Sequence, residues 1–413
     1  MSKELKKTTY QIPIGPIHPA LKEPVMFKFE IDGEKIVDVD VELGQVHRAI
    51  EWTGMRRNSI QIIYLAERIC GICSFVHPLA FCRAVENACE IDVPERSDYI
   101  RVVHGELERI CSHLLWAGVA AHEIGFDSLL FLTWEVREKA LDLVEYLTGN
   151  RITKAILTIG GVRRDIKKEH HQKIKETMDA LKEGYKQLGH IFLDDKTVKM
   201  RSQGCGVLSY EDALRLCAVG PTTRASGVKK DVRADQPYTA YGDIGVDYMT
   251  PDIITGEVNG DVYDRIIVRL LEVKQSIDLI EKAIDQMPAG DLVSEPKIPK
   301  LLSRIKKTKG EGVGRDEAPR GEVIHYVKFD GEHDEPFTWK VRASTYANIL
   351  PWIPMLKGEQ IADIPIVAAS IDPCMSCTNR VAVVNNLDNK KYMLNKEHLH
   401  ELSIMKTRRL KHK

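Results

Sequence analysis

The chain has 413 residues, of which 43% are hydrophobic and 29% are charged. This composition is that of a globular protein large enough for two or three subdomains, and it excludes a disordered or fibrous chain. The 59 basic and 60 acidic residues give a net charge of -1, so nothing indicates a nucleic-acid partner. No stretch approaches the roughly 18 apolar residues of a membrane span, and the first residues lack the apolar core of a signal peptide. We therefore expect a chain that is soluble by itself and cytoplasmic.

The first predicted elements are β-strands. Apolar and polar residues alternate over residues 26–31 and 36–41, and an Asp-Gly pair at 32–33 is typical of a hairpin turn between them. A small β-sheet is therefore expected near the N-terminus.

The middle of the chain has the pattern of long amphipathic helices. Apolar residues recur at helical spacing over 102–119 and over 134–147, and the second of these stretches is followed by Gly149, a typical helix stop. A helical body is expected in this part of the chain.

Glycine and proline return after the helices. The glycines between 310 and 314 and the Ala-Pro-Arg-Gly sequence at 318–321 are interpreted as loop punctuation, and strand-like segments follow at 323–327 and 337–341. A second small sheet is predicted here.

These patterns together predict an α+β fold that is mainly α, with a central bundle of long helices and small β-sheets from the N-terminal and C-terminal regions. We divide the chain into an N-terminal β region at 1–54, a helical body at 55–298 and a C-terminal α/β region at 299–413.

Two Cys-x-x-Cys pairs stand at opposite ends of the chain, Cys70 with Cys73 and Cys374 with Cys377. Thiolates select zinc, iron–sulfur clusters or soft transition metals, and this spacing lets both sulfurs of one turn bind one ion. In a structural zinc site the second pair usually follows after about 12–20 residues. The much longer loop here favours a metal in the centre of the fold, with structural zinc as the alternative.

The residues around both pairs form recognisable motifs. Residues 68–77 match Arg-x-Cys-Gly-x-Cys-x-x-x-His, and residues 372–380 match Asp-Pro-Cys-x-x-Cys-x-x-Arg. In these motifs the chain resembles nickel–iron hydrogenase large subunits, whose fold it is expected to share. It is most similar to the energy-converting, membrane-associated branch, which is related to the quinone-site subunit of respiratory complex I. That further likeness rests on four segments, at 12–19, 160–165, 219–227 and 318–322.

The resemblance implies a nickel–iron centre held by the four cysteines. Cys70 and Cys374 would be terminal ligands of nickel, while Cys73 and Cys377 would also bridge to an iron that carries small diatomic ligands. Such thiolates donate electron density to a redox-active nickel that keeps an open coordination position.

Three further residues receive roles from the resemblance. Glu23 would relay protons near a terminal cysteine, because burial can raise a carboxyl pKa toward neutrality. Arg320 would lie over the diatomic ligands of the iron, and His77 would donate a hydrogen bond to a cysteine sulfur. Without the family, the same residues read as an exposed glutamate, a turn arginine and a core histidine. Glu123 and Asp127 are weaker candidates for a polar pathway.

The implied protein is the catalytic large subunit of a membrane-bound, energy-converting hydrogenase that reduces protons to hydrogen. Its electrons would come from a small iron–sulfur subunit with a 4Fe-4S cluster. Membrane-embedded, proton-pumping or antiporter-like subunits would be further partners, and the chain would be peripheral on the cytoplasmic side of the membrane.

Two other functions fit the same residues. A nickel-free relative would keep the cysteines and act in a membrane-bound sulfane sulfur or polysulfide reductase. The chain continues for 33 residues after Arg380, past the point where maturation cleavage is expected in hydrogenases, which is compatible with such a relative. A complex-I-like quinone or coupling subunit is the second alternative, and the four cysteines argue against it because that subunit has lost them.

Overall fold

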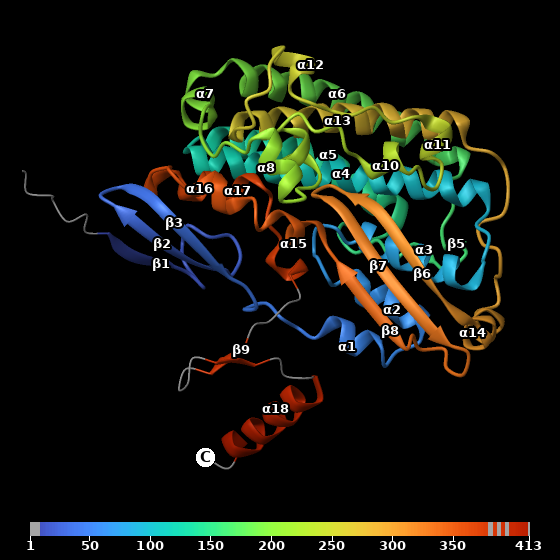
Figure 1. The fold of residues 1–413 in the computed structure, drawn as a ribbon. Helices are drawn as coiled ribbons and strands as arrows, with labels where there is room; N and C mark the ends of the chain where they lie inside the picture. The colour runs from blue at the N-terminus through green and yellow to red at the C-terminus, as the bar shows by residue number, and fades with distance from the viewer. Residues whose placement is uncertain (1–8, 379–382, 386–389, 393–395, 412–413) are drawn as a thin grey trace, which may run out of the picture.

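The structure is a computed structural model that describes residues 9–378, 383–385, 390–392 and 396–411. Long helices form a bundle, and two three-stranded sheets lie along one side of it (Figure 1). The predicted fold, mainly α with small sheets from both ends of the chain, is confirmed. Within the described ranges, every helix is too short or too polar to cross a membrane.

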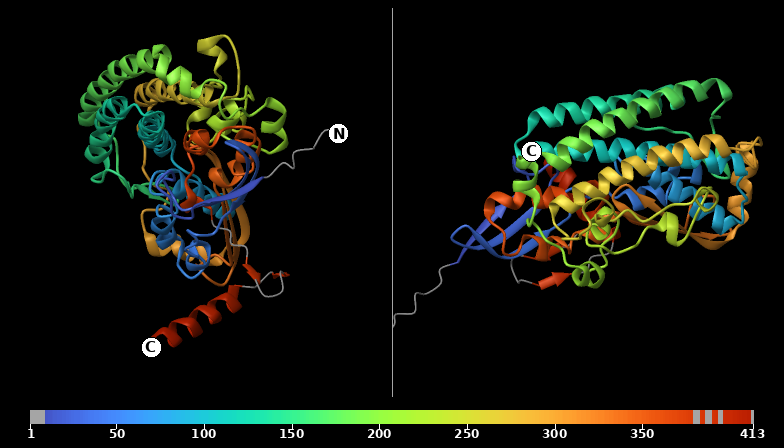
Figure 2. Two further views of the ribbon diagram at one scale, coloured as in Figure 1. Left: turned by 90° about the vertical axis from the view of Figure 1, so that its left-hand side faces the viewer. Right: turned by 90° about the horizontal axis from the view of Figure 1, so that it is seen from above.

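Four long helices make up the bundle, and seen from above they run side by side along the molecule (Figure 2). The helix α4 packs against both α5 and α13, and α6 packs on the outer side of the same two helices. The end of α5 at Gly149, which adopts a left-handed φ of 81°, is as predicted. The bundle helices are α4 (Glu95–Ile124), α5 (Asp127–Thr148), α6 (Lys168–Asp194) and α13 (Val262–Gln286).

The N-terminal sheet is antiparallel, with the strand order β1-β2-β3. Its alternating side chains bury one face, and the Phe27 ring meets the Trp352 ring edge-on at 5.0 Å between centroids. The loop between the first two strands, residues 15–25, carries Glu23. The strands are β1 (Tyr10–Ile14), β2 (Met26–Asp32) and β3 (Lys35–Glu42).

The C-terminal sheet corrects one prediction. The glycines between 310 and 314 are not loop punctuation, because they lie inside its first strand. A Cβ at Gly312 or Gly314 would overlap the backbone of α3 (Val76–Cys89), so these glycines let the helix and the sheet touch directly. The strands, in antiparallel order, are β6 (Lys309–Ala318), β7 (Gly321–Asp330) and β8 (Thr338–Arg342).

The segment that carries the second cysteine pair lies between the two sheets and beneath the bundle (Figure 1). Its α17 packs against α4 and α13, and α16 packs against β3, so the two ends of the chain meet. The three-region division of the chain stays a prediction. The elements of this segment are α15 (Ser344–Asn348), α16 (Trp352–Leu356), η1 (Ile361–Asp363), α17 (Ile364–Ser370) and η2 (Met375–Cys377).

Shorter elements complete the described fold. They are α1 (Ile50–Gly54), α2 (Ser59–Ala66), β4 (Leu157–Thr158), β5 (Gly161–Val162), α7 (Lys196–Ser202), α8 (Tyr210–Arg215), α9 (Pro221–Arg224), α10 (Val232–Asp235), α11 (Tyr241–Ile244), α12 (Asp252–Thr255), α14 (Ile298–Lys307), β9 (Val383–Asn385), β10 (Lys390–Tyr392) and α18 (Lys396–Lys411).

Candidate metal centre

The first cysteine pair lies in the turn that leads into α3. The buried carboxylate of Glu108, on α4, accepts the backbone N–H groups of Phe75 at 2.6 Å and Val76 at 3.1 Å. These are among the N–H groups at the start of α3 that have no partner within the helix, so the carboxylate caps the helix. The backbone N–H of Cys73 points at the Cys70 sulfur at 3.2 Å. Arg48 also donates to the Ile69 carbonyl oxygen at 2.8 Å, so a helix terminus and one distant side chain fix this pair.

The second pair lies on the 3-10 turn η2 and is fixed by residues from elsewhere. The backbone N–H of Cys374 donates to Thr345 Oγ1 at 3.1 Å, and Arg48 Nη2 donates to the carbonyl oxygen of Ser376 at 3.1 Å. Asp372, just before the pair, has a φ of 55°, which is unusual for a residue with a side chain. Tertiary contacts therefore hold this turn.

The two pairs meet in the interior. The Cys374 sulfur lies 3.1 Å from the Cys70 sulfur and 3.2 Å from the Cys377 sulfur, and these three sulfurs all lie within 4.8 Å of one another. The Cys73 sulfur, also buried, accepts a hydrogen bond from Arg320 at 3.2 Å. None of the four cysteines forms a disulfide. Four buried thiols in this arrangement are a donor set that fits a soft transition metal such as nickel.

The four thiols differ in acidity. Hydrogen bonds from the thiols of Cys374, Cys377 and Cys73 hold the pKa of Cys70 well below its ordinary value. Hydrogen bonds among the sulfurs, together with burial and the charge on Cys70, hold the pKa of each of the other three thiols well above its ordinary value. A metal that binds all four sulfurs must therefore displace protons as it enters.

Arg320 joins the two pairs. Its Nε donates to the Asp372 carbonyl oxygen and its Nη2 to the Asp372 carboxylate, both at 2.7 Å, while Nη1 donates to Cys73. The side chain is fully buried, and its turn presses against Gly220, where a Cβ would overlap the Arg320 backbone. A fixed cation therefore faces the thiols.

Glu23 lies at the second pair, as the opening loop predicts. Its Oε2 accepts the backbone N–H groups of Met375 and, at 3.3 Å, Ser376. Burial raises the pKa of Glu23 although these two hydrogen bonds oppose the shift. The carboxyl group can therefore hold a proton beside the second pair.

The two weaker candidates separate. Glu123 is half-buried and forms an ion pair with Lys22 at 2.7 Å, whereas Asp127 is exposed and bonds only to His122 at 2.8 Å among the described residues. Of the two, Glu123 therefore contacts the opening loop that carries Glu23.

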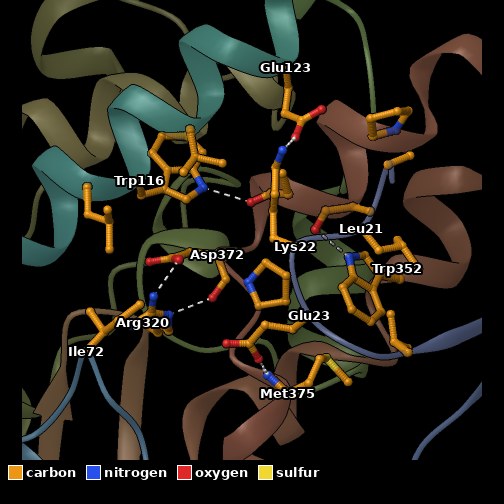
Figure 3. Close-up of a pocket in the computed structure, with 18 of the residues that line it drawn as sticks. Leu21, Lys22, Glu23, Ile72, Trp116, Glu123, Arg320, Trp352, Asp372 and Met375 are labelled. Atoms are coloured by element: carbon orange, nitrogen blue, oxygen red, sulfur yellow. Dashed lines mark hydrogen bonds and ion pairs between the residues drawn. The ribbon is translucent and has the colours of Figure 1, made fainter. Parts of the chain in front are cut away.

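A cavity of about 280 Å³ adjoins the second pair (Figure 3). Its walls are mostly apolar, and Glu23, Arg320 and Asp372 line one side, while the Lys22–Glu123 ion pair lies on another. The apolar wall is formed chiefly by Leu21, Phe27, Trp116, Val119 and Trp352.

His77 contacts the second pair rather than the first. Its Nε2 lies 3.7 Å from the Cys377 sulfur, and its Nδ1 lies 3.1 Å from Nε2 of His325. Burial lowers the pKa of His77 to about 4, so the ring is neutral near pH 7.

Sequence reasoning missed His325 and Glu108. The alternation of apolar residues at 323 and 327 marks 325 as a buried position, and a buried polar ring there was the available signal.

Two protein-family models match the segments that carry the cysteine pairs. The family model for the respiratory-chain NADH dehydrogenase 49 Kd subunit matches residues 123–380, which contain the second cysteine pair. The model for nickel-dependent hydrogenase matches residues 48–117, which contain the first pair.

Individual relatives cover nearly the whole chain. The membrane-bound hydrogenase subunit alpha of Pyrococcus furiosus is 47% identical over 98% of this chain and 96% of its own length. The carbon monoxide-induced hydrogenase of Rhodospirillum rubrum is 39% identical over 90% of this chain and 100% of its own. A chain in a solved structure of the membrane-bound sulfane sulfur reductase, an archaeal respiratory membrane complex, has a TM-score of 0.83 and 29% identity. That likeness covers 91% of this chain and all of the other. The protein therefore belongs to the family that unites nickel–iron hydrogenase large subunits with the 49 Kd subunit of respiratory-chain NADH dehydrogenase.

Proposed function

We propose that this oxidoreductase-family chain is the catalytic large subunit of a membrane-bound, complex-I-related hydrogenase that reduces protons to hydrogen. The observation that carries the proposal is the meeting of four buried thiols from two Cys-x-x-Cys pairs. Relatives that cover at least nine tenths of this chain and carry hydrogenase names support it.

The four thiols of Cys70, Cys73, Cys374 and Cys377 would hold a nickel–iron centre. When bound, that centre supplies redox chemistry and an open coordination position. Arg320 contributes a buried positive charge that offsets the negative charge of the thiolates.

Glu23 would move protons. Its carboxyl group, with a pKa raised by burial, borders both the cavity and the second cysteine pair. A proton taken up at its Oε atoms from the cavity side can pass toward the Cys374 sulfur. The cavity itself is mostly apolar, so a small uncharged molecule crosses it at a lower desolvation cost than a polysulfide anion does.

The proposed partners are a small subunit with a 4Fe-4S cluster and membrane-embedded, proton-pumping or antiporter-like subunits. The chain would be peripheral on the cytoplasmic side of the membrane. The relatives, which include a subunit of a membrane-bound hydrogenase and a chain of a respiratory membrane complex, support this arrangement.

A nickel-free sulfane sulfur reductase is the second candidate, and the superposition with a TM-score of 0.83 favours it. The decisive experiment is analysis of nickel and iron in the purified native complex, with an infrared scan for iron-bound carbon monoxide and cyanide. We expect about one nickel per chain together with those bands, as four thiolate donors suit nickel. Absence of both, with all iron present as clusters, would refute the hydrogenase proposal in favour of sulfur reduction.

A further inference from the structure

A line of hydrogen-bonding side chains runs from the C-terminal sheet to the second cysteine pair. The indole Nε1 of Trp339, on β8, lies 3.2 Å from Nδ1 of His325, on β7. Nε2 of His325 lies 3.1 Å from Nδ1 of His77, on α3, and Nε2 of His77 lies 3.7 Å from the Cys377 sulfur. All four residues are buried. Each ring nitrogen in the line therefore faces one defined neighbour.

The line has a fixed direction. An indole N–H can only donate, so His325 Nδ1 must accept. A neutral imidazole has one donor and one acceptor nitrogen, so His325 donates through Nε2 and His77 accepts at Nδ1. The remaining proton of His77 then lies on Nε2, which points at the Cys377 sulfur. Burial lowers the pKa of both histidines, to about 4 for His77, which keeps the rings neutral.

The thiols continue the same direction. The Cys377 thiol donates to the Cys374 sulfur, and the Cys374 thiol donates to the Cys70 sulfur. The lone pairs of the Cys377 sulfur are thereby left to accept a hydrogen bond from His77.

We propose that Trp339 and His325 are positioning residues, which fix His77 in the tautomer that carries its proton on Nε2 and so present a permanent donor to the Cys377 sulfur. Without this constraint, the His77 ring could turn an unprotonated nitrogen toward the sulfur, and two electron-rich atoms would face each other. The inference rests on the proposed function only for the role of Cys377 as a metal ligand, because the tautomer is set in the protein itself.

The packing around the indole makes the constraint rigid. The Trp339 ring is completely buried, and a Cβ at Gly54 would overlap it. The Phe81 ring meets it edge-on at 5.6 Å between centroids. The indole therefore has no room to turn its N–H away from His325.

The test is nitrogen NMR of the full chain without metal, with ¹⁵N-labelled histidine, because protonated and unprotonated ring nitrogens have different chemical shifts. We expect protonated Nε2 in both His77 and His325. The substitution Trp339→Phe keeps an aromatic ring and removes the donor, so both histidines should then populate the second tautomer as well. Trp352→Phe is the matched control, since this equally buried indole donates to the Ala368 carbonyl oxygen at 3.1 Å. It should leave both tautomers unchanged.

A second pair of variants acts on the middle of the line and keeps the Trp339 indole, whose ring lies 5.8 Å from the His325 ring between centroids. In His325→Gln, the amide can accept from Trp339 and donate to His77, so His77 should keep its proton on Nε2. In His325→Leu, His77 should populate both tautomers. A wild-type His77 with its proton on Nδ1, or equal tautomer populations in the Gln and Leu variants, would overturn the inference whatever the metal content. Absence of nickel in the native complex would instead refute the proposed function and leave this result standing.

Discussion

The two cysteine pairs face the same centre, yet they are held in different ways. The first pair is held mainly by secondary structure: it leads into α3, whose N-terminus is capped by Glu108 from the neighbouring helix α4. Arg48 and Arg320 add one bond each to this segment. The second pair lies on a short 3-10 turn that is held by single side chains from distant parts of the chain, namely Glu23, Arg48, Arg320 and Thr345.

This difference separates two ways to position a ligand. A helix terminus that is packed against a sheet, as α3 is against β6 and β7, positions its cysteines through many weak contacts, so the effect of losing any one contact is small. A turn held by a few hydrogen bonds depends on each of them. We therefore expect substitutions around the second pair to have the larger effects, and four substitutions test this expectation.

The largest effect is expected from Arg320→Met. This change leaves the Asp372 carboxylate buried without its counter-charge and removes the donor to Cys73. Breaking a buried ion pair on one side costs about 3–5 kcal/mol, which urea unfolding of the metal-free chain would measure. The matched control is Arg315→Met, because Arg315 is partly exposed and its partner Glu322 keeps a second arginine. That change should cost less than about 1 kcal/mol, and equal losses in the two variants would contradict the expectation.

Glu23→Gln is expected to act on the rate more than on the fold. The Gln side-chain oxygen can still accept from the backbone of Met375 and Ser376, but the amide cannot carry the proton. Loss of a general acid or base lowers rates by about 100-fold or more, equivalent to about 2.7 kcal/mol in the barrier. Hydrogen evolution by the assembled complex is the measurement, with the exposed Glu34→Gln as control. Near-normal activity in Glu23→Gln would remove Glu23 from the proton route.

Glu108→Gln probes the first pair. The amide retains one acceptor for the start of α3, but it leaves the buried Lys154 ammonium, 3.1 Å from Glu108, without its ion-pair partner. The charge of Glu67 still acts on this ammonium and limits the cost. We expect a loss of about 2 kcal/mol in the free energy of unfolding, smaller than that for Arg320→Met. The exposed Glu138→Gln, on α5, should change stability by less than about 0.5 kcal/mol. A larger loss for Glu108→Gln than for Arg320→Met would reverse the ranking of the two pairs.

The same contrast explains what the sequence could predict. The helical body and the strands follow from spacing within one segment, so 102–119 and 134–147 were identified as helices, and both lie inside longer ones. The two cysteine pairs were found because each is a local motif. The sequence does not identify Glu108, whose carboxylate caps α3, because nothing in the spacing of α4 indicates which of its buried polar residues meets another helix.

The glycines of β6 show the opposite error. Between residues 310 and 314 they look like turn residues, since glycine is common in loops. In the structure, Gly312 and Gly314 let β6 lie directly against α3, the helix that carries His77. These positions must lack a side chain only because β6 packs against α3. No local sequence pattern reveals that requirement.

The smallest expected effect is on the pH dependence of stability. It can be compared for one carboxyl group beside each cysteine pair. Burial raises the pKa of Glu23, beside the second pair, and of Glu67, which precedes the first. The folded protein therefore binds more protons than the unfolded chain, so stability declines as the pH rises from the ordinary glutamate pKa through the raised one, and then levels off. Glu23→Gln and Glu67→Gln should each remove part of this decline, and unfolding between about pH 4 and pH 8 measures it.

For Glu67, the charges of Arg68 and Lys154 oppose the shift, whereas for Glu23 the negative charge of Cys70 adds to it. A stability difference between wild type and either variant that does not change with pH would show that the carboxyl group titrates alike in the folded and unfolded chains.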